Sequence, residues 1–327
     1  IGDKTILAGL TFGVERGTLV AIVGVNDAGK STLIKLLSGF ENPNYGKVFI
    51  HGLDMEKRRR ETRELIGYVP HENDLDPWLT VEQNIRAVLE TLDDSDDERD
   101  ATLDELMAEF GITHLRNTPS VNLSGGERRR LEIARALAAS PTFLLLDEPL
   151  GALDMKLRRQ MQEELKAIQK RVGTTFIHVT HDQEEAMAIG DTIVIMNNGV
   201  IEDQGDPQRI YLKPVSKFAA DFMGESNFID GTVVYSRAGS TAVETQIGRF
   251  EVEGTAKRGT SVTLAIRPEH LNQSENGLIN LKVDLVEQLG SDNLVYGQLK
   301  DKKDFCYRCP GNQTIEKGVN LGLNIEN

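Results

Sequence analysis

The stretch LVAIVGVNDAGKSTLIKLL, residues 19–37, decides the fold of the first part of the chain. Its first five residues are all apolar, as in a strand buried on both faces, and residues 30–37 have the pattern of a helix. Between them, residues 24–31 match G-x-x-x-x-G-K-[ST]. Gly24 and Gly29 let the backbone curl so that successive N–H groups face one anion. The stretch therefore predicts a phosphate-binding loop, in which Lys30 reaches the β- and γ-phosphates and the Ser31 hydroxyl binds Mg²⁺.

The residues that follow extend the same alternation of strands and helices. Apolar runs at residues 143–146, 176–179 and 193–196 predict further buried strands, and residues 156–171 form one of the helical patterns between them. Buried strands alternating with helices are typical of a parallel sheet covered on both faces. Residues 99–139 are helical in pattern without a strand, which predicts a helical insertion on this α/β core.

The character of the chain changes after about Gly224. Four short strand-like runs separated by Gly and Asn turns follow, with no long helix between them, at residues 231–235, 261–266, 281–286 and 293–296. This pattern predicts a small antiparallel barrel or sandwich. The two parts join near residues 214–227.

Composition excludes several classes of function. The 327 residues suit two domains, and 51 acidic against 37 basic residues give a formal net charge of −14. With only 6% aromatic residues as well, the chain lacks the basic face and the stacking surface of a nucleic-acid-binding protein. No apolar run reaches the roughly 18 residues that span a bilayer, so work at a membrane would require a partner. The chain begins at Ile1 without a signal-peptide pattern, which leaves open whether the natural N-terminus precedes it.

Two minor patterns have ordinary explanations. The acidic run DDSDDE at residues 93–98 is expected to be a solvated loop between helices rather than a metal site. Cys306 and Cys309 have C-x-x-C spacing, but the chain has only these two cysteines and no His close by in sequence. Two reduced thiols are therefore favoured over a metal or redox site.

A second motif supports the phosphate site. Residues 143–148, FLLLDE, place Asp147 and Glu148 at the end of a buried strand. A carboxylate at this point can hold Mg²⁺ beside bound phosphates, and the next one can polarise an attacking water as a general base. Alone the pair is a weak signal, because strands often end in solvated acids. Together with the phosphate loop it indicates nucleotide hydrolysis.

A third motif resembles the signature of one family. In residues 123–127, LSGGE, Ser124 and two glycines precede a helical pattern and form a second phosphate cradle. The motif resembles the signature of ATP-binding-cassette (ABC) ATPases, in which this cradle binds the γ-phosphate held by the other subunit. Residues 151–154, GALD, look like the family's D-loop, and His181 in VTHD, residues 179–182, looks like its switch histidine.

The resemblance implies a set of site residues for ATP and Mg²⁺. Catalysis would fall to Glu148, His181 and His71, and the Mg²⁺ ligands would be Ser31, Asp147 and His71. Nucleotide contacts would come from the phosphate loop, the signature motif and the D-loop: Gly24, Asn26, Ala28, Gly29, Lys30, Ser31, Thr32, Ser124, Gly125, Gly126, Glu127 and Asp154.

The second half of the chain resembles one particular group within the ABC ATPases. The segments EPLGALD (148–154), THDQEEAM (180–187), SKFAADFMG (216–224) and IRPEH (266–270) resemble the ATPases of polyamine, iron, sulfate and maltose importers. That group carries a C-terminal OB-like barrel called the TOBE domain. The resemblance implies an α/β P-loop ABC ATPase domain over residues 1–224, with its helical insertion at about 80–140, and an all-β regulatory and dimerisation domain over residues 225–327. Residues 30–37 and 67–78 are instead closer to exporter-type ABC ATPases, and residues 105–110 and 124–138 resemble the lipopolysaccharide-transport ATPase.

Three positions depart from the family pattern. His71 stands where the family has a Gln that touches Mg²⁺ and the attacking water; alternatively, its ring only packs between Pro70 and Glu72. Asp27 replaces a usual glycine of the phosphate loop: Asp tolerates the left-handed backbone, but its carboxylate should weaken phosphate binding. The adenine-stacking aromatic of the family would fall at about Ile1 and is not found there.

The resulting hypothesis is the ATP-hydrolysing subunit of an ABC importer, peripheral on the cytoplasmic face of the cell membrane. It implies a head-to-tail homodimer or a pair of ABC ATPases, integral membrane permease subunits and a substrate-binding protein, and no nucleic acid. The alternatives are an exporter ATPase, a non-transport ABC protein of DNA repair or translation, and a metabolic kinase, which the signature motif disfavours. The cargo is not predicted, because in this family specificity lies in other subunits.

Overall fold

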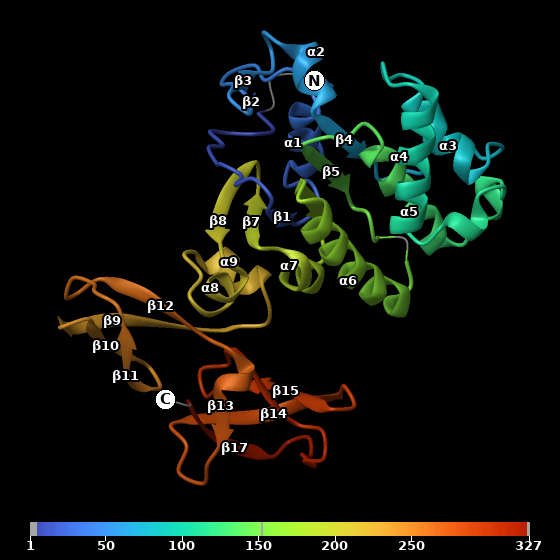
Figure 1. The fold of residues 1–327 in the computed structure, drawn as a ribbon. Coiled ribbons are helices and arrows are strands. Elements are labelled where there is room, and N and C mark those ends of the chain that lie inside the picture. The colour runs from blue at the N-terminus through green and yellow to red at the C-terminus, as the bar shows by residue number, and fades with distance from the viewer. Residues whose placement is uncertain (1–4, 152, 326–327) are drawn as a thin grey trace. The chain divides into compact units, whose positions relative to one another are not determined.

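A computed structural model describes residues 5–151 and 153–325 of the chain. The chain divides into two compact units, unit 1 (Ile1–Lys213) and unit 2 (Pro214–Asn327) (Figure 1). This division lies earlier in the chain than the domain boundary after Gly224 that the sequence suggests, because the short helix that follows Pro214 belongs to unit 2.

Unit 1 is built on a six-stranded sheet. In spatial order its strands are β4 (Ile66–Val69), β5 (Phe143–Asp147), β6 (Thr175–Thr180), β1 (Leu19–Gly24), β7 (Thr192–Asn197) and β8 (Val200–Gly205). Neighbouring strands pair in parallel, except that β8 runs antiparallel to β7 at the edge. Val23 pairs with Thr180 and Asp147 with Val179, so the carboxyl ends of β1, β5 and β6 meet at one edge of the sheet. The buried strands expected from the four apolar runs are confirmed.

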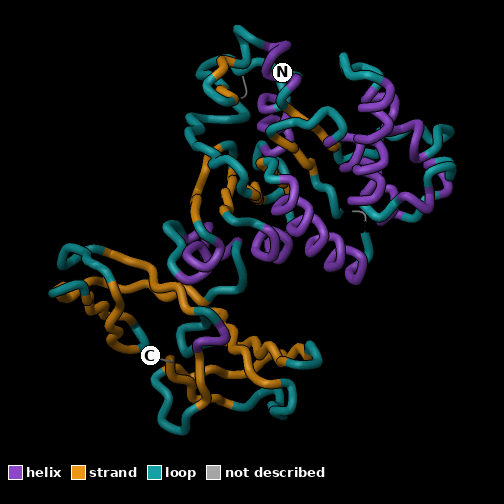
Figure 2. Tube along the Cα trace, viewed as in Figure 1, coloured by secondary structure: helices purple, strands orange, loops and turns teal. Residues whose placement is uncertain are grey.

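Helices cover both faces of this sheet (Figure 2). They are α1 (Lys30–Leu37), α2 (Arg59–Glu64), α6 (Met155–Val172), α7 (Gln183–Ile189) and α8 (Pro207–Leu212), and a small hairpin joins β2 (Phe49–Ile50) to β3 (Leu53–Asp54). Leu144 and Leu146 of β5 pack into one core with α6, whereas Leu145 packs into another with Leu33 and Ile34 of α1. Successive strand residues thus face opposite cores, which explains why the runs are apolar at every residue except His178.

A helical segment lies between β4 and β5. It contains α3 (Val81–Leu89), α4 (Asp96–Glu109) and α5 (Gly125–Leu137), which begin with the capping boxes Thr80–Gln83, Ser95–Glu98 and Ser124–Glu127. The expectation that residues 93–98 form a connecting loop is wrong for the last three of them. Asp96, Asp97 and Glu98 form the first turn of α4, because acidic side chains stabilise a helix N-terminus.

Unit 2 begins with α9 (Lys217–Phe222) and continues in two antiparallel sheets. The first sheet, in spatial order, contains β11 (Gly248–Glu253), β10 (Ser240–Thr245), β9 (Asn227–Arg237) and β12 (Ser261–Ile266). The second contains β13 (Leu271–Gln273), β17 (Asn320–Ile325), β14 (Ile279–Gln288), β15 (Asp292–Gln298) and β16 (Asp304–Pro310). Residues from both sheets, among them Ile229, Ile266, Leu281 and Val295, share one core. The all-β, barrel-like second domain expected from the sequence is confirmed.

A buried arginine fastens α9 to the sheets of unit 2. Arg267 follows β12, and its Nη1 donates hydrogen bonds to the carbonyl oxygens of Ala220 and Gly224, each at 2.8 Å, and of Glu225 at 3.2 Å. The same nitrogen lies 2.7 Å from the hydroxyl oxygen of Ser226. One side chain thereby binds the Ala220 carbonyl in the last turn of α9 and two carbonyls of the segment that follows the helix.

Two further side chains hold the same segment against β16. Asn227 bonds both backbone groups of Cys306, donating to its carbonyl and accepting from its N–H, each at 2.7 Å. The Glu225 carboxylate accepts from the Tyr296 hydroxyl at 2.7 Å and lies 3.3 Å from Cys306 Sγ. Burial, and then the Glu225 carboxylate, raise the pKa of the Cys306 thiol, and burial raises the pKa of Cys309. Both cysteines are free and buried.

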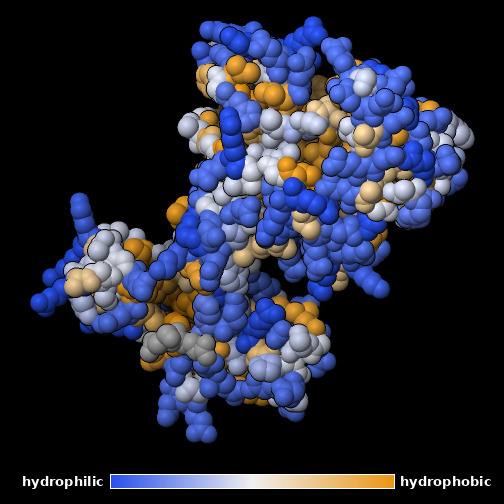
Figure 3. Space-filling view, in the orientation of Figure 1, coloured by the Kyte–Doolittle hydropathy of each residue, from blue (hydrophilic) through white to orange (hydrophobic). Residues whose placement is uncertain are grey.

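The surface is largely hydrophilic on the face drawn in Figure 3, where apolar residues gather only in small groups. In the described part of the chain, no helix has both the length and the apolar character that a bilayer crossing requires.

Candidate active site at the carboxyl ends of the parallel strands

The predicted phosphate loop forms the turn between β1 and α1. A Cβ atom at Gly24 would lie 2.2 Å from the carbonyl oxygen of Met196, so only glycine fits there. Gly29 has φ 98° and Asp27 has φ 62°, which confirms that Asp27 takes the left-handed backbone. Gly29 is also the N-cap of α1, and because it has no side chain to cap the helix, the first N–H groups of α1 receive no hydrogen bond from the cap residue.

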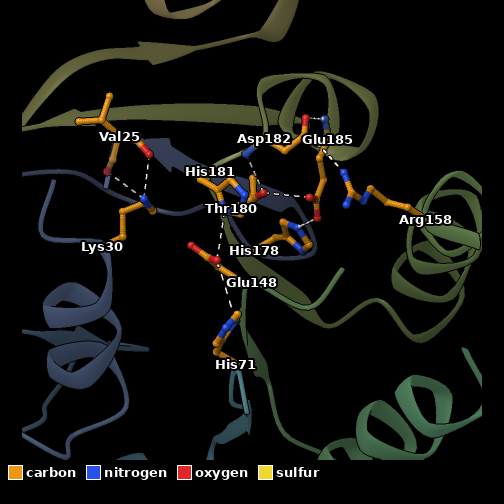
Figure 4. Close-up of polar contacts among 11 residues, drawn as sticks. Val25, Lys30, His71, Glu148, Arg158, His178, Thr180, His181, Asp182 and Glu185 are labelled. Carbon is orange, nitrogen blue, oxygen red and sulfur yellow. Dashed lines mark hydrogen bonds and ion pairs between the residues drawn. The ribbon is translucent and has the colours of Figure 1, made fainter. Parts of the chain in front are cut away.

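The side chains of the loop differ in their exposure. Lys30 is buried, and its Nζ donates to the carbonyl oxygens of Gly24 at 2.7 Å and Val25 at 3.0 Å (Figure 4). Burial lowers the pKa of Lys30, and the nearby carboxylates, Glu148 foremost, oppose that shift. The ammonium group is thus held inside the loop and interacts electrostatically with the acidic pair after β5. Of the remaining predicted contacts, Asn26 and Ser31 are exposed, Thr32 is half-buried and Ala28 is buried.

The acidic pair lies where β5 ends, at the same edge of the sheet. Burial raises the pKa of the Asp147 carboxyl, the adjacent Glu148 raises it further, and His71 and Lys30 act in the opposite direction. Glu148 has φ 46°, a conformation that is costly for a residue with a side chain and is often found at functional positions. Its N–H donates to the carbonyl of Val179 at 2.9 Å, which fixes the start of the following loop to β6.

Two histidines face the Glu148 carboxylate from different loops (Figure 4). His181 Nδ1 lies 3.0 Å from Glu148 Oε2, within hydrogen-bond distance, and His71 Nδ1 lies 3.9 Å from the same oxygen. The structure therefore brings together the three residues predicted to be catalytic. The His71 ring points toward Glu148, which does not fit the alternative in which it only packs between Pro70 and Glu72.

A buried hydrogen-bond network fixes the loop that carries His181. Glu185 Oε1 lies 2.5 Å from His178 Nε2, and Glu185 Oε2 accepts from the Thr180 hydroxyl at 2.8 Å. The Thr180 hydroxyl oxygen accepts from the Asp182 N–H at 3.0 Å, and Asp182 Oδ1 caps α7 by accepting from the Glu185 N–H at 3.1 Å. Both neighbours of His181 are therefore held in place. The sequence pattern assigns none of these supporting residues, although polar side chains flanking a strand-end histidine are a usable signal.

The predicted signature motif begins α5. Ser124 is the N-cap, and both its hydroxyl and its N–H donate to Glu127 Oε2, at 2.7 and 2.8 Å. These two hydrogen bonds, that of the side chain first, lower the pKa of the Glu127 carboxyl. Ser124 and Gly125 are exposed, whereas Gly126 is buried. The motif thus presents a helix N-terminus and the small residues Ser124 and Gly125 to solvent, with the Glu127 carboxylate bonded to Ser124.

The segment after Glu148 packs against this motif. A Cβ atom at Gly125 would lie 3.2 Å from the Leu153 side chain, so the glycine permits a close approach. Asp154 is the N-cap of α6, and its Oδ1 accepts from the Leu157 N–H at 3.0 Å. Ala152 in the predicted D-loop, and Ile1 where an adenine-stacking aromatic was expected, lie outside the described residues.

Comparisons with known families match both units. The family described as "ABC transporter" matches residues 7–151, and the family described as "TOBE domain" matches residues 264–326.

Similar proteins match most of the chain. The spermidine/putrescine import ATP-binding protein PotA of Acetivibrio thermocellus is 38% identical over 277 residues, which cover 84% of this chain and 78% of that protein. The protein of the same name from Mesorhizobium japonicum is 33% identical over 335 residues, covering 100% of this chain and 92% of the relative.

Two solved structures resemble the first part of the chain. One is a subunit of the cbiONQ ABC transporter complex from Clostridium perfringens, with a TM-score of 0.60 and 30% identity, covering 63% of this chain and 83% of that one. The other is an ATP-binding cassette solved as a dimer in a post-hydrolysis state with ADP and Pi, with a TM-score of 0.55 and 28% identity, covering 63% and 94%.

Proposed function

Because this chain belongs to the ABC transporter family and is the ATP-hydrolysing subunit of an importer, we propose that its transporter carries a polyamine such as spermidine or putrescine. The relatives named for the import of these two compounds match 84% and 100% of this chain, and so extend over both units. They also confirm the importer interpretation over the exporter alternative. As an import ATPase the chain is peripheral on the cytoplasmic face of the membrane, where it pairs with a second ATPase and with permease subunits.

For the chemistry we assign the general base to Glu148. Its carboxylate stands at the strand edge that also carries the phosphate loop, and His181 touches one of its oxygens at 3.0 Å. A carboxylate in this place can accept the proton of a water that attacks the γ-phosphate. His181 then holds the carboxylate in position, and Lys30 with the N–H groups of the loop binds the phosphates. This convergence of Glu148, His181 and Lys30 at one edge is the observation that carries the assignment.

The donor set at this edge suits Mg²⁺. The Ser31 hydroxyl and the Asp147 carboxylate supply oxygen, which this ion prefers, whereas the imidazole of His71 suits other divalent metals better. The phosphate loop follows β1 and Asp147 ends β5, and the strand registers place the carboxyl ends of these strands at one edge of the sheet. When bound with nucleotide, the ion would offset phosphate charge in the transition state. Ser31 and Asp147 would hold it, and His71 would border it.

The second half of each site would come from another copy of the chain. Ser124 and Gly125 are exposed at the start of α5, where they can receive a phosphate held by a partner. We therefore assign a head-to-tail homodimer with two ATP sites, each between one subunit's residues 24–31 and the other's residues 124–127. Closure around ATP would drive the permease, and a substrate-binding protein would deliver the cargo.

Reconstitution tests the proposed cargo. The chain, its permease subunits and its binding protein are co-purified and placed in liposomes, and ATP hydrolysis is measured with each candidate compound. Spermidine or putrescine should stimulate hydrolysis several-fold, while maltose, sulfate and ferric iron should leave it at the basal rate. Stimulation by one of these other compounds, and none by either polyamine, would overturn the proposal.

A further inference from the structure

One arginine joins the two loops that meet at Glu148. Arg158 lies in the first turn of α6 and carries a half-buried side chain. Its Nη1 donates to Asp182 Oδ2 at 3.0 Å, and its Nη2 donates to the carbonyl oxygen of Leu153 at 3.2 Å. One guanidinium group thus connects the segment after Glu148 with the residue that follows His181, and Figure 4 shows its contact with Asp182.

The two acceptors of Arg158 are themselves fixed. The Asp182 carboxylate uses its other oxygen to cap α7, and the Leu153 N–H donates to the carbonyl of Leu150 at 3.2 Å. The backbone of Arg158 is also held in place, because its backbone N–H donates to the carbonyl of Asp154 at 2.8 Å. A planar guanidinium offers donors at fixed angles and can serve two acceptors at once.

These bonds close a ring of contacts around the reacting carboxylate. Glu148 begins the segment that ends at Leu153, Arg158 links Leu153 to Asp182, and His181 next to Asp182 returns to Glu148 at 3.0 Å. A shift of the segment after Glu148 would therefore pull on His181 through Arg158. Without the arginine, the two loops would be free to separate by the small distances that matter for catalysis.

We propose that Arg158 is a positioning residue that keeps His181 against Glu148 during ATP hydrolysis. The inference rests on the roles assigned above to those two residues. Arg158 acts on the geometry of the base and leaves the phosphate loop untouched. Its loss should therefore lower kcat and spare KM for ATP.

The first test is Arg158→Met, which keeps an unbranched apolar side chain and removes both hydrogen bonds. We expect kcat to fall about ten- to hundredfold, with KM for MgATP within about twofold of the parent. Arg158→Lys should recover part of the loss, because an ammonium group can still reach one acceptor but lacks the fork. The matched control is Arg171→Met, which removes another arginine–carboxylate pair of α6, to Glu109 at 2.7 Å. Its kcat should stay within about twofold of the parent.

A double-mutant cycle separates positioning from general damage. Asp182→Asn keeps an oxygen that can cap α7 but loses the charge that holds Arg158. Both single variants should lower kcat, and the double variant should be no slower than the slower single one. Effects that multiply, or a kcat for Arg158→Met equal to that of Arg171→Met, would overturn the proposal. If Arg158→Met does not fold, as judged by circular dichroism, Arg158→Lys and Asp182→Asn decide the question through the same split between kcat and KM.

The outcome also separates this inference from the assignment of the base. Glu148→Gln with parental turnover would show that Glu148 is not the base, whatever Arg158 does. An inactive Glu148→Gln together with a fully active Arg158→Met would leave the base in place and refute only the role of Arg158.

Discussion

The two units use their polar side chains in different ways. In unit 1, two histidines that follow β4 and β6 face the carboxylate that follows β5, and the side chains of His71 and His181 remain 58% and 54% exposed. In unit 2, Arg267 and Asn227 are buried and bond backbone groups of their own unit. Polar groups that are hydrogen-bonded inside the protein stabilise its fold. Polar groups that face solvent from the rigid edge of a sheet can bind a ligand. The contrast predicts that carboxylates, glycines and histidines matter for turnover in unit 1 and that polar residues matter for stability in unit 2.

The largest expected effect comes from matched carboxylate changes in the two units. Glu148→Gln should retain ATP binding and lower turnover about 10²–10⁴-fold, because the base is gone. It should also accumulate a dimer with MgATP, visible by size-exclusion chromatography, since hydrolysis normally reopens the pair. Glu225→Gln in unit 2 should hydrolyse ATP at the parental rate. Equal turnover by Glu148→Gln and Glu225→Gln would contradict the predicted difference between the two units.

The next prediction asks whether the site of unit 1 is complete in one chain. Gly125→Asp places a carboxylate where the partner's γ-phosphate would bind and should lower turnover at least about hundredfold, with monomeric ATP affinity nearly unchanged. Gly125→Ala adds a methyl group near Leu153 without charge and should lose less.

Mixing two inactive variants sharpens this test. A dimer of Gly125→Asp and Lys30→Ala chains can contain one site with neither lesion, so some hydrolysis should return. If the isolated Gly125→Asp monomer lost ATP affinity to the same extent as turnover, the motif would belong to the site of its own chain.

Unit 2 should respond to a change at Arg267 through its stability. Arg267→Met removes the hydrogen bonds from a buried guanidinium to the carbonyl oxygens of Ala220, Gly224 and Glu225, which we expect to lower the free energy of local opening by about 2–3 kcal/mol. Because both cysteines of the chain are buried in unit 2, their reaction with a thiol reagent reports this opening. The reaction should become about 30- to 150-fold faster, at unchanged ATP affinity. Lys303→Met, which removes an exposed ion pair to Asp230, is the control and should change it little.

The smallest expected effect is at His71. A glutamine offers a neutral carbonyl and an amide donor, whereas the shorter imidazole lies 3.9 Å from the carboxylate oxygen. His71→Gln should therefore raise turnover by about two- to tenfold, measured as steady-state phosphate release. His270→Gln, an exposed histidine of unit 2, should have no effect. Identical rates for all three proteins would show that His71 does not take the place of the glutamine.

The parts of the site that follow from the sequence are those whose determinants are close together along the chain. Gly24, Gly29 and Lys30 lie within one turn, so their spacing already implies the loop that the structure contains. Asp147 and Glu148 likewise follow directly from an apolar run. The support around His181 is different. The bond between Arg158 and Asp182 joins two helices whose approach depends on the packing of the whole sheet.

In the fold, too, the elements that depend on tertiary structure are not evident from the local sequence. The buried strands of unit 1 are evident because the runs that predict them are apolar at every residue except His178. By contrast, β8, with the sequence VIEDQG, lies at the sheet edge and lacks that signal. In unit 2, β11 alternates half-buried and exposed residues, and β10 buries only three residues in a row, so both strands have a weak sequence pattern. Arg267 stands in a motif that is plain in the sequence, yet its partners at residues 220–226 are set by tertiary structure.

The hydrogen bonds between Arg267 and the end of α9 also affect which recombination points between related genes yield a folded protein. A crossover after Gly224 would take the carbonyls of Ala220 and Gly224 from one parent and the guanidinium of Arg267 from the other. With a crossover between Lys213 and Pro214, α9, Arg267 and Asn227 all come from the same parental gene. Chimaeras joined at the earlier point should fold more often, and a gene that acquires a new second unit should acquire α9 with it.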